Sequence, residues 1–443
     1  MTATPTTAQQ RRRAALASWV GTTIEYYDYA CYGIAASLVF ADLFFPAADP
    51  LVGTLLSLAS FAAGYIARPL GALVFGHLGD RLGRKNTLIF TLILMGAATF
   101  TIGVLPTYQS IGITAPALLL LARILQGVSA GGEYGGAVLM TVEHSGHKRR
   151  GFFGSLVNTG TTAGLLLANL AFLPVFSMEK SSMEAWGWRV PFLVSAILVV
   201  VGLVARLAVT ESPEFAEVKQ RNAVRKLPIL DAFRSSWRNM VLVAFGIVAS
   251  GTAFTMASVY SLAYGKDGLG LDNDRMLSVL LPATVVILIC VPLFGTLADR
   301  IGLRAVFLGG AASLMVLPFI WFALLGTRHY GWMLLGFSLL LIGYSANYSV
   351  VPAYFSSVFP SEVRFSGMSI AFTTGLLGGN AIAPALSAWL LATTDGWVAI
   401  AIYMSATAFV SLIAGLFLRV PDGAARVPAG PAVPLSRPSP QNS

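Results

Sequence analysis

Long apolar runs separated by short clusters of charge make up almost the whole chain. No Asp, Glu, Lys or Arg occurs between Lys85 and Arg123, between Met240 and Gly265, or within residues 366–391. Each of these runs is long enough for one or two helices of about 20 residues across a hydrocarbon layer of roughly 30 Å. Because lipid offers no water to an open backbone, the runs predict membrane-spanning helices.

The pattern predicts twelve such helices, six in each half of the chain, and therefore an all-α membrane protein of two pseudo-symmetric halves. We place them at residues 16–40, 52–76, 87–106, 115–142, 151–174, 190–209, 239–262, 276–297, 305–325, 331–358, 366–391 and 397–419. The predicted divisions are a cytoplasmic tail at 1–15, an N-terminal bundle at 16–209, a cytoplasmic linker at 210–238, a C-terminal bundle at 239–419 and a disordered tail at 420–443.

Two matching charged clusters begin at Gly76 and Gly295, 219 residues apart (295 minus 76), and indicate a tandem duplication. A two-half membrane bundle is the usual architecture of an alternating-access transporter. We expect the glycines to form tight turns, the aspartates to cap or pair with helix ends, and the arginines to lie at the lipid headgroups. The candidate gating residues are Gly76, Asp80, Arg81, Gly83, Arg84, Asp299 and Arg300.

Composition and charge narrow the class and the orientation. With 56% hydrophobic and 11% charged residues, the chain is not expected to be a soluble globule. Most of its Lys and Arg fall on one side of the predicted helices, so the positive-inside rule places both termini in the cytoplasm. The net charge of +9 then reflects topology and attraction to anionic lipid rather than nucleic-acid binding. We expect a multi-pass protein of the inner, cytoplasmic membrane.

Five ionisable residues are predicted at membrane depth: Glu25, Asp28, Arg68, Arg123 and Glu133. Such residues are costly in lipid and are functional candidates by default. Glu25, Asp28 and Glu133 are therefore candidates for proton coupling, and Arg68 for pairing within the membrane. The alternative is that Glu25 or Asp28 is permanently paired with Arg68 or Arg123 and only holds helices together.

Spacing on two helices suggests a substrate site. Glu25, Asp28, Tyr29 and Tyr32 stand at i, i+3, i+4 and i+7, so they share one face of the first helix, which we expect to line a cavity. Arg123 and Gln126 share a face of the fourth helix, and the Arg123 guanidinium could hold a substrate carboxylate with two hydrogen bonds. Glu133 lies about 80° around that helix from Arg123, so the two are not expected to pair directly.

These residues resemble the motifs of the major facilitator superfamily, over nearly the whole chain. The two charged clusters resemble its loop signature, and the segments 25–29, 68–72, 131–136 and 186–192 are similar to the metabolite:proton symporter family, with residues 360–364 closest to its shikimate-transporter branch. The resemblance implies proton symport of a carboxylate such as shikimate, another organic acid or a zwitterionic osmolyte. It also implies a central cavity lined by helices 1, 4, 7 and 10, to which Asn158, Tyr344, Asn347 and Tyr348 would contribute.

Other functions stay open at this point. A proton-independent facilitator needs no membrane carboxylates, an efflux antiporter of the same superfamily is expected to carry a proline-containing motif in helix 5 that residues 154–164 lack, and a metabolite-sensing receptor is expected to append a signalling domain. An enzyme is not expected, because the four histidines lie near predicted interfaces without a nucleophile or a metal-ligand partner. We expect no cofactor and no metal, protons and a small metabolite as partners, and function as a monomer.

Overall fold

The computed structural model describes residues 7–46, 49–394 and 396–419. In that part of the chain every regular element is a helix. The first half contains α1 (Ala8–Leu38), α2 (Phe40–Phe44), α3 (Pro50–Leu82), α4 (Arg84–Val104), α5 (Tyr108–Ile111), α6 (Thr114–Ser145), η1 (His147–Arg149), α7 (Arg150–Phe176), α8 (Lys180–Ser182), η2 (Met183–Gly187) and α9 (Arg189–Leu207).

The second half follows a short helix, α10 (Pro213–Gln220). It contains α11 (Pro228–Thr255), η3 (Met256–Tyr260), α12 (Ser261–Leu269), α13 (Asn273–Ile301), α14 (Leu303–Gly326), α15 (Tyr330–Ser349), α16 (Val351–Ser356), α17 (Arg364–Leu376), η4 (Leu377–Ala381), α18 (Ile382–Thr394) and α19 (Val398–Phe417). Two of these segments, η3 and η4, are single π-helical turns that continue a longer helix.

The predicted all-α membrane fold is confirmed. Within the described residues, ten helical segments are long and apolar enough to cross a membrane. The long helices α1 and α3, with 31 and 33 residues, occupy the other two predicted spans.

Helix ends differ from the prediction on the charged side of the bundle. α1 begins at Ala8, inside the expected tail, because Thr7 and Gln10 form a capping box there. The expected linker contains α10, and α11 already begins at Pro228, since proline is favoured in the first turn of a helix. The predicted tail at 420–443 lies outside the described residues.

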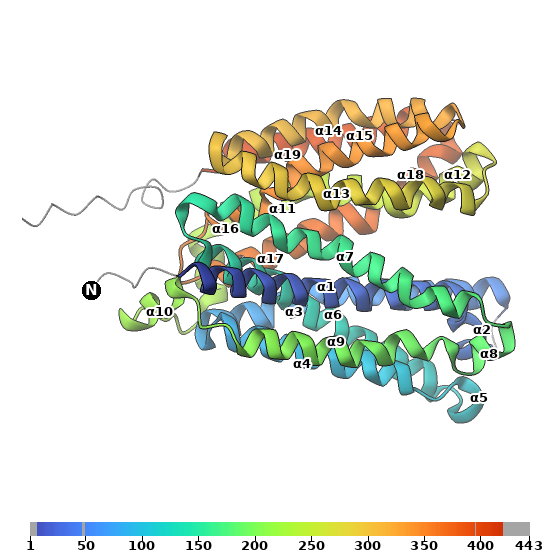
Figure 1. The fold of residues 1–443 in the computed structure, drawn as a ribbon, viewed down its shortest axis with the longest axis horizontal. Coiled ribbons are helices and arrows are strands. Elements are labelled where there is room, and N and C mark those ends of the chain that lie inside the picture. The colour runs from blue at the N-terminus through green and yellow to red at the C-terminus, as the bar shows by residue number, and fades with distance from the viewer. Residues whose placement is uncertain (1–6, 47–48, 395, 420–443) are drawn as a thin grey trace, which may run out of the picture.

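The helices form two groups that lie side by side (Figure 1). α1 to α9 make up one group and α11 to α19 the other, and the groups meet where α7 packs on α13 and α3 packs on α17. The first residues of α1, the helix α10 and both duplicated turns lie at the same end of the bundle, which we call the loop end. In those turns Gly83 and Gly302 have φ angles of 106° and 101°, which explains why glycine is needed at both positions.

Within the first half, α3 and α6 approach so closely that their backbones touch. A Cβ atom at Gly71 of α3 would overlap the carbonyl of Val128, and one at Gly131 of α6 would overlap the carbonyl of Arg68. Small residues permit this approach, which is how helices gain van der Waals contact where lipid removes the hydrophobic driving force.

Gly131→Val should therefore destabilise the protein, by about 1–3 kcal/mol if the two helices separate only enough to accept the side chain. The measurement is the thermal unfolding midpoint in detergent micelles. Gly309→Val is the matched control, since Gly309 is an exposed glycine of α14 where an added Cβ atom would meet no other atom within 4 Å. Equal midpoints for the two variants would contradict close packing of α3 on α6.

Candidate functional site: a neutral cavity backed by buried charges

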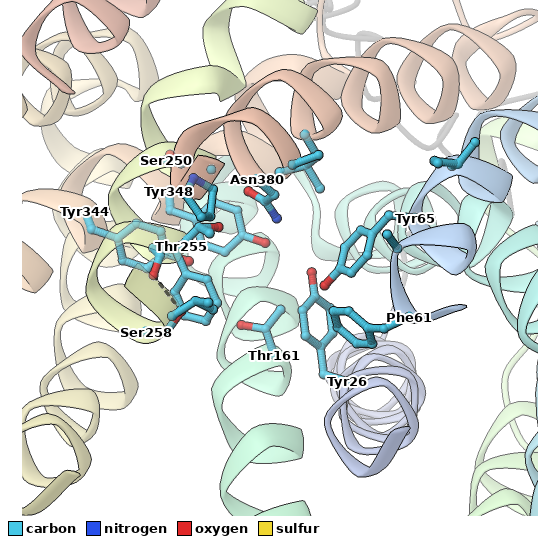
Figure 2. Close-up of a pocket in the computed structure, with 18 residues that line it drawn as sticks. Tyr26, Phe61, Tyr65, Thr161, Ser250, Thr255, Ser258, Tyr344, Tyr348 and Asn380 are labelled. Atoms are coloured by element: carbon cyan, nitrogen blue, oxygen red, sulfur yellow. Dashed lines mark hydrogen bonds between the residues drawn. The ribbon is translucent and has the colours of Figure 1, made fainter. Parts of the chain in front are cut away.

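A cavity of about 320 Å³ lies between the two helix groups (Figure 2). The first group contributes side chains of α1, α3 and α7, and the second those of α11, η3, α15, α17, η4 and α18. The lining consists of Tyr26, Phe61, Ala62, Tyr65, Ile66, Thr161, Ser250, Gly251, Phe254, Thr255, Ser258, Val259, Tyr344, Tyr348, Leu376, Asn380, Ala381 and Pro384.

Aromatic rings and neutral polar groups dominate this lining, and none of the side chains that form it is charged. Several of its hydroxyls already donate within the protein: Ser258 to the Phe254 carbonyl at 2.7 Å, and Ser250 to the Asn347 side-chain oxygen at 2.6 Å. A hydroxyl that donates one hydrogen bond keeps two lone pairs with which it can accept. The wall therefore offers ring faces, hydrogen-bond acceptors and the hydroxyl groups of its tyrosines.

The set of helices around the cavity differs from the expectation. Helices 1, 7 and 10 contribute, as α1, α11 with η3, and α15, but α6, the fourth long helix, supplies no lining residue. α3, α7 and the segment from α17 to α18 take part instead. α6 packs most extensively on α3, and it is α3 that supplies the wall on this side of the cavity.

Glu25 and Arg68 form a buried ion pair directly behind this wall. Their closest side-chain atoms are 3.1 Å apart, and the residues are 0% and 5% exposed. The Arg68 guanidinium also lies over the rings of Tyr29 and Tyr65, 4.2 Å and 4.9 Å from their centroids. Tyr65 and Tyr26 thus separate the charged pair from the cavity. Glu25 has the arginine partner expected of a carboxylate that is permanently paired and only holds helices together.

Glu133 is paired with Arg206 of α9, a residue that sequence reasoning missed. The Arg206 guanidinium donates to Glu133 and to the Leu88 carbonyl, and the Thr91 hydroxyl donates to the second Glu133 oxygen at 2.7 Å. Arg206 is only 3% exposed. The signal for it was a single arginine in the last turn of an otherwise apolar helix, which looks like an ordinary positive-inside residue.

Asp28 differs from the other two carboxylates because its partners are hydroxyls. Thr99 donates to one carboxylate oxygen at 2.7 Å and Ser195 to the other at 2.5 Å. Asp28 is fully buried, and among the described residues it takes part in no ion pair within 4.0 Å. A carboxylate held in this way can gain or lose a proton without breaking a salt bridge.

Arg123 is also fully buried, and it lies behind Phe61 rather than in the cavity. It donates to the Gln126 side-chain oxygen at 3.1 Å and to the Phe61 carbonyl at 3.3 Å. Its guanidinium lies 4.1 Å and 4.3 Å from the ring centroids of Tyr29 and Tyr32. The helix face that carries Tyr29 and Tyr32 therefore covers Arg123, and the expectation that this face lines the cavity is wrong for this conformation.

The neutral polar residues predicted at the cavity, three in the second half and Asn158 in the first, differ in where they lie. Tyr344 and Tyr348 line the cavity and stack on each other, with ring centroids 5.1 Å apart. Asn347 faces away from it, accepting from Ser250 and donating to the Phe307 carbonyl. Asn158 donates to the Tyr348 carbonyl at 2.6 Å, so it joins the two halves beside the cavity.

At the loop end, the two duplicated aspartates cap helices of the opposite half. Asp80 accepts the backbone N–H groups of Phe365 and Ser366 at the start of α17, at 3.2 Å and 2.9 Å. Asp299 accepts those of Gly151 and Phe152 at the start of α7, at 2.7 Å and 3.0 Å. A carboxylate at a helix N-terminus satisfies free donors and the helix dipole together. The expected capping is present, and it crosses between the halves.

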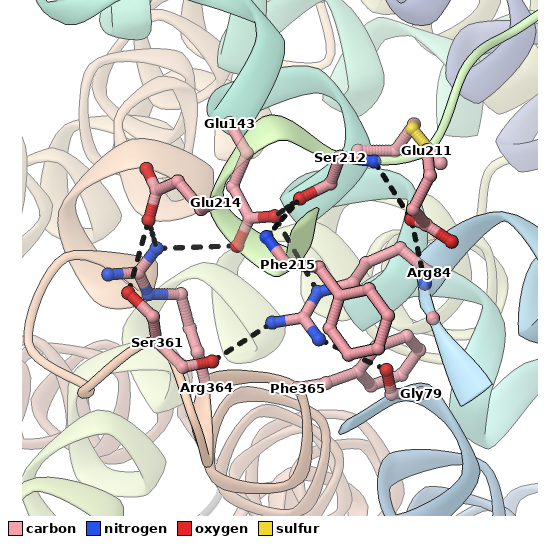
Figure 3. A network of polar contacts seen from close by, with 12 residues as sticks. Gly79, Arg84, Glu143, Glu211, Ser212, Glu214, Phe215, Ser361, Arg364 and Phe365 are labelled. Atoms are coloured by element: carbon pink, nitrogen blue, oxygen red, sulfur yellow. Dashed lines mark hydrogen bonds and ion pairs between the residues drawn. The ribbon is translucent and has the colours of Figure 1, made fainter. Parts of the chain in front are cut away.

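A network of charges surrounds the first of these caps (Figure 3). Arg84 is paired with Asp80 at 3.4 Å and Glu143 at 3.5 Å, and it donates to the Ser361 carbonyl at 3.1 Å. Arg84 is fully buried, so its predicted position at the lipid headgroups is wrong; the exposed Arg81 and Arg300 fit that description. Arg364 of the second half completes the network by pairing with Glu143.

The helix α10 joins this network through Glu214, which pairs with Arg364 and with Arg150, the latter at 2.8 Å. Burial alone would raise the pKa of Glu214, but the two guanidiniums outweigh it and the pKa is lowered. A lowered pKa means that the contribution of this group to stability is present at neutral pH and is lost as the pH falls through that pKa. The loop end is thus held closed by ionised groups.

Arg206→Met should lower the free energy of unfolding by about 3–5 kcal/mol, because it leaves Glu133 as an uncompensated buried charge. The double variant Arg206→Met with Glu133→Gln should recover most of that loss. Thermal unfolding of both variants in detergent measures the effect. A double variant no more stable than Arg206→Met alone would show that the pair does not hold α6 to α9.

The chain is similar to transport proteins over nearly its whole length. The chain is 38% identical over 421 residues to the inner membrane metabolite transport protein YhjE of Escherichia coli (strain K12), covering 92% of this chain and 94% of that protein. It is 34% identical to the shikimate transporter and 32% identical to the proline/betaine transporter of the same strain, each over 92% of this chain and over 94% and 83% of those proteins.

A similar fold occurs in the solved structure of the proton:xylose symporter XylE bound to 6-bromo-6-deoxy-D-glucose, with a TM-score of 0.69 over 92% of this chain and 94% of that one. The sequences are 16% identical, so this likeness concerns the fold alone. The sequence profile of the Major Facilitator Superfamily matches residues 18–379, with a second match over residues 283–439. The chain therefore belongs to the Major Facilitator Superfamily.

Proposed function

We propose that the protein is a proton-coupled importer that carries a small zwitterionic metabolite across the cytoplasmic membrane by alternating access. The observation that carries the proposal is the neutral cavity between the two halves, with the buried carboxylates Glu25, Asp28 and Glu133 in the half behind it. The relatives named as metabolite, shikimate and proline/betaine transporters support a transport function. Each copy holds a whole cavity, so a monomer suffices.

The direction of opening follows from the two ends of the bundle. The loop end carries the basic clusters and lies in the cytoplasm by the positive-inside rule. The cavity residues Phe61 and Tyr65 lie in the half of α3 that is farther from the loop end. In the other helix group, Ser258 and Val259 of η3 are also remote from the loop end. Because the Asp80 and Asp299 caps hold the two halves together at the loop end, we assign this conformation to the outward-facing state of an importer.

The cavity chemistry favours a zwitterion over a net anion. A free anion such as shikimate would find no cation in the lining, because Arg68 and Arg123 stand behind aromatic rings and are 5% and 0% exposed. A positively charged ammonium is attracted by ring faces such as those of Phe254 and Tyr344. The carboxylate of the same molecule would meet the tyrosine hydroxyls on the Arg68 side.

An uptake screen tests this proposal. Proteoliposomes with an inwardly directed proton gradient should accumulate radiolabelled glycine betaine or proline, and a protonophore should abolish that accumulation. Shikimate tests the net anion, and empty liposomes provide the background. Accumulation of shikimate alone would contradict the proposal that the substrate is a zwitterion. Accumulation of any of the three compounds that is unaffected by the protonophore would contradict proton coupling.

Asp28 is the proposed proton carrier, because Glu25 and Glu133 are each neutralised by an arginine. Asp28→Asn should abolish accumulation against a gradient while it leaves exchange of labelled for unlabelled substrate across the membrane. Asp42→Asn is the matched control, since Asp42 is an exposed aspartate of α2. Accumulation by Asp28→Asn at the level of the unchanged protein would remove Asp28 from the proton path.

A further inference from the structure

A continuous line of buried hydrogen bonds joins Asp28 to the cavity wall. Arg123 donates to the Gln126 side-chain oxygen at 3.1 Å, the Gln126 amide donates to the Thr99 hydroxyl at 2.7 Å, and Thr99 donates to Asp28 at 2.7 Å. All four residues are fully buried. At its other end, Arg123 holds the carbonyl of Phe61, whose side chain lines the cavity.

The guanidinium fixes the direction of every bond in this line. Arginine has donors only, so the Gln126 oxygen must face Arg123 and the Gln126 NH₂ group must face Thr99. The Thr99 oxygen therefore accepts from Gln126, and its own proton goes to Asp28. Each link follows from the previous one, and no freedom remains in the amide orientation while Asp28 is an acceptor.

Resting on the proposed role of Asp28 as proton carrier, we infer that Gln126 and Thr99 are positioning residues that transmit the protonation state of Asp28 to Arg123 and the Phe61 wall. A proton bound to the Asp28 oxygen that faces Thr99 turns that oxygen into a donor. Thr99 then accepts from Asp28, and its own proton no longer has that carboxylate as its acceptor. We assign this proton to the Gln126 side-chain oxygen, which faces Thr99 once the amide has rotated by half a turn. The Gln126 NH₂ group now faces the Arg123 donors, and the bond between them is lost.

The consequence appears at the cavity. Among the described residues, Gln126 is the only side chain to which Arg123 donates, and that bond is lost. The Arg123 guanidinium is left with the Phe61 carbonyl and the surrounding rings. Its position, and with it the position of Phe61, then changes with the protonation of a carboxylate that does not itself line the cavity. No proton crosses the line: the proton stays on Asp28, and only the direction of donation reverses.

Few other groups can produce the same response. The titratable or charged groups near Asp28 are Glu25, Tyr27 and Cys31 on α1 and Arg123 on α6. α4 and α9 present the hydroxyls of Thr99 and Ser195. α3 directs Arg68 at Glu25, and α7 carries its only charged residue, Arg150, at the loop end.

A fluorine label at position 61 tests the inference without a substrate, since the proton is the probe. Phe61 is replaced by 4-fluorophenylalanine in the full-length protein, and the ¹⁹F resonance is followed by NMR as the pH is changed. The resonance should move in a single transition that Asp28→Asn abolishes. Thr99→Val, which keeps the shape but removes the hydroxyl, should lose the transition, and Thr99→Ser should keep it.

The matched control is Thr101→Val, because Thr101 is an exposed threonine of α4 whose hydroxyl donates to the Ala97 carbonyl of its own helix. It should keep the transition. A transition that persists in Thr99→Val, or one that is lost equally in Thr99→Ser, overturns the relay. A protein with no transition at all, but with uptake that still depends on Asp28, also overturns the relay and leaves the proposed function intact.

Discussion

The structure depends on one constraint: a charge enclosed in a membrane bundle must be compensated by the protein, because lipid offers no water to do so. The protein compensates the buried charges Glu25, Glu133, Asp28 and Arg123 in three different ways. Glu25 and Glu133 have arginine partners, Asp28 has two hydroxyls, and Arg123 has an amide, a carbonyl and three aromatic rings. These solutions lie in the first half of the chain and leave the cavity wall neutral.

The same constraint explains the division of work between the halves. The second half has no charged residue in the cavity wall and contributes rings, hydroxyls and the amide of Asn380. Two of its charged residues act at the loop end, where Asp299 caps α7 and Arg364 joins the network around Arg84. The duplication is therefore preserved in the caps that hold the halves together, and it has been lost in the chemistry behind the cavity.

Much of the fold could be read from the sequence because helix spans and duplicated turns depend on local patterns. The apolar runs located all twelve long helices, and the glycine and aspartate pattern predicted the turns at Gly83 and Gly302 and the caps. Tertiary partners could not be read. Arg84 and the exposed Arg81 look alike in sequence. Arg84 is buried because partners distant in the chain, among them Glu143, Phe215 and Ser361, surround its guanidinium.

The candidate site shows the same limit. Helical spacing predicted that Glu25, Asp28, Tyr29 and Tyr32 share one face of α1, but it did not tell which face lines the cavity. Tyr26 is the residue of α1 that lines it. Arg206 was missed because an arginine in the last turn of an apolar helix is typical of the cytoplasmic boundary. Its partner Glu133 lies on another helix, and the pair exists only in the folded bundle.

Proton movement during substrate entry is the quantity that tests the account most directly. A pH electrode in a weakly buffered suspension of proteoliposomes records it when glycine betaine is added without any imposed gradient. The account predicts that the medium becomes alkaline as protons enter with the substrate, and that Asp28→Asn takes up no proton while it still exchanges substrate. Substrate entry with no change in external pH, or the same alkalinisation in Asp28→Asn, would contradict it.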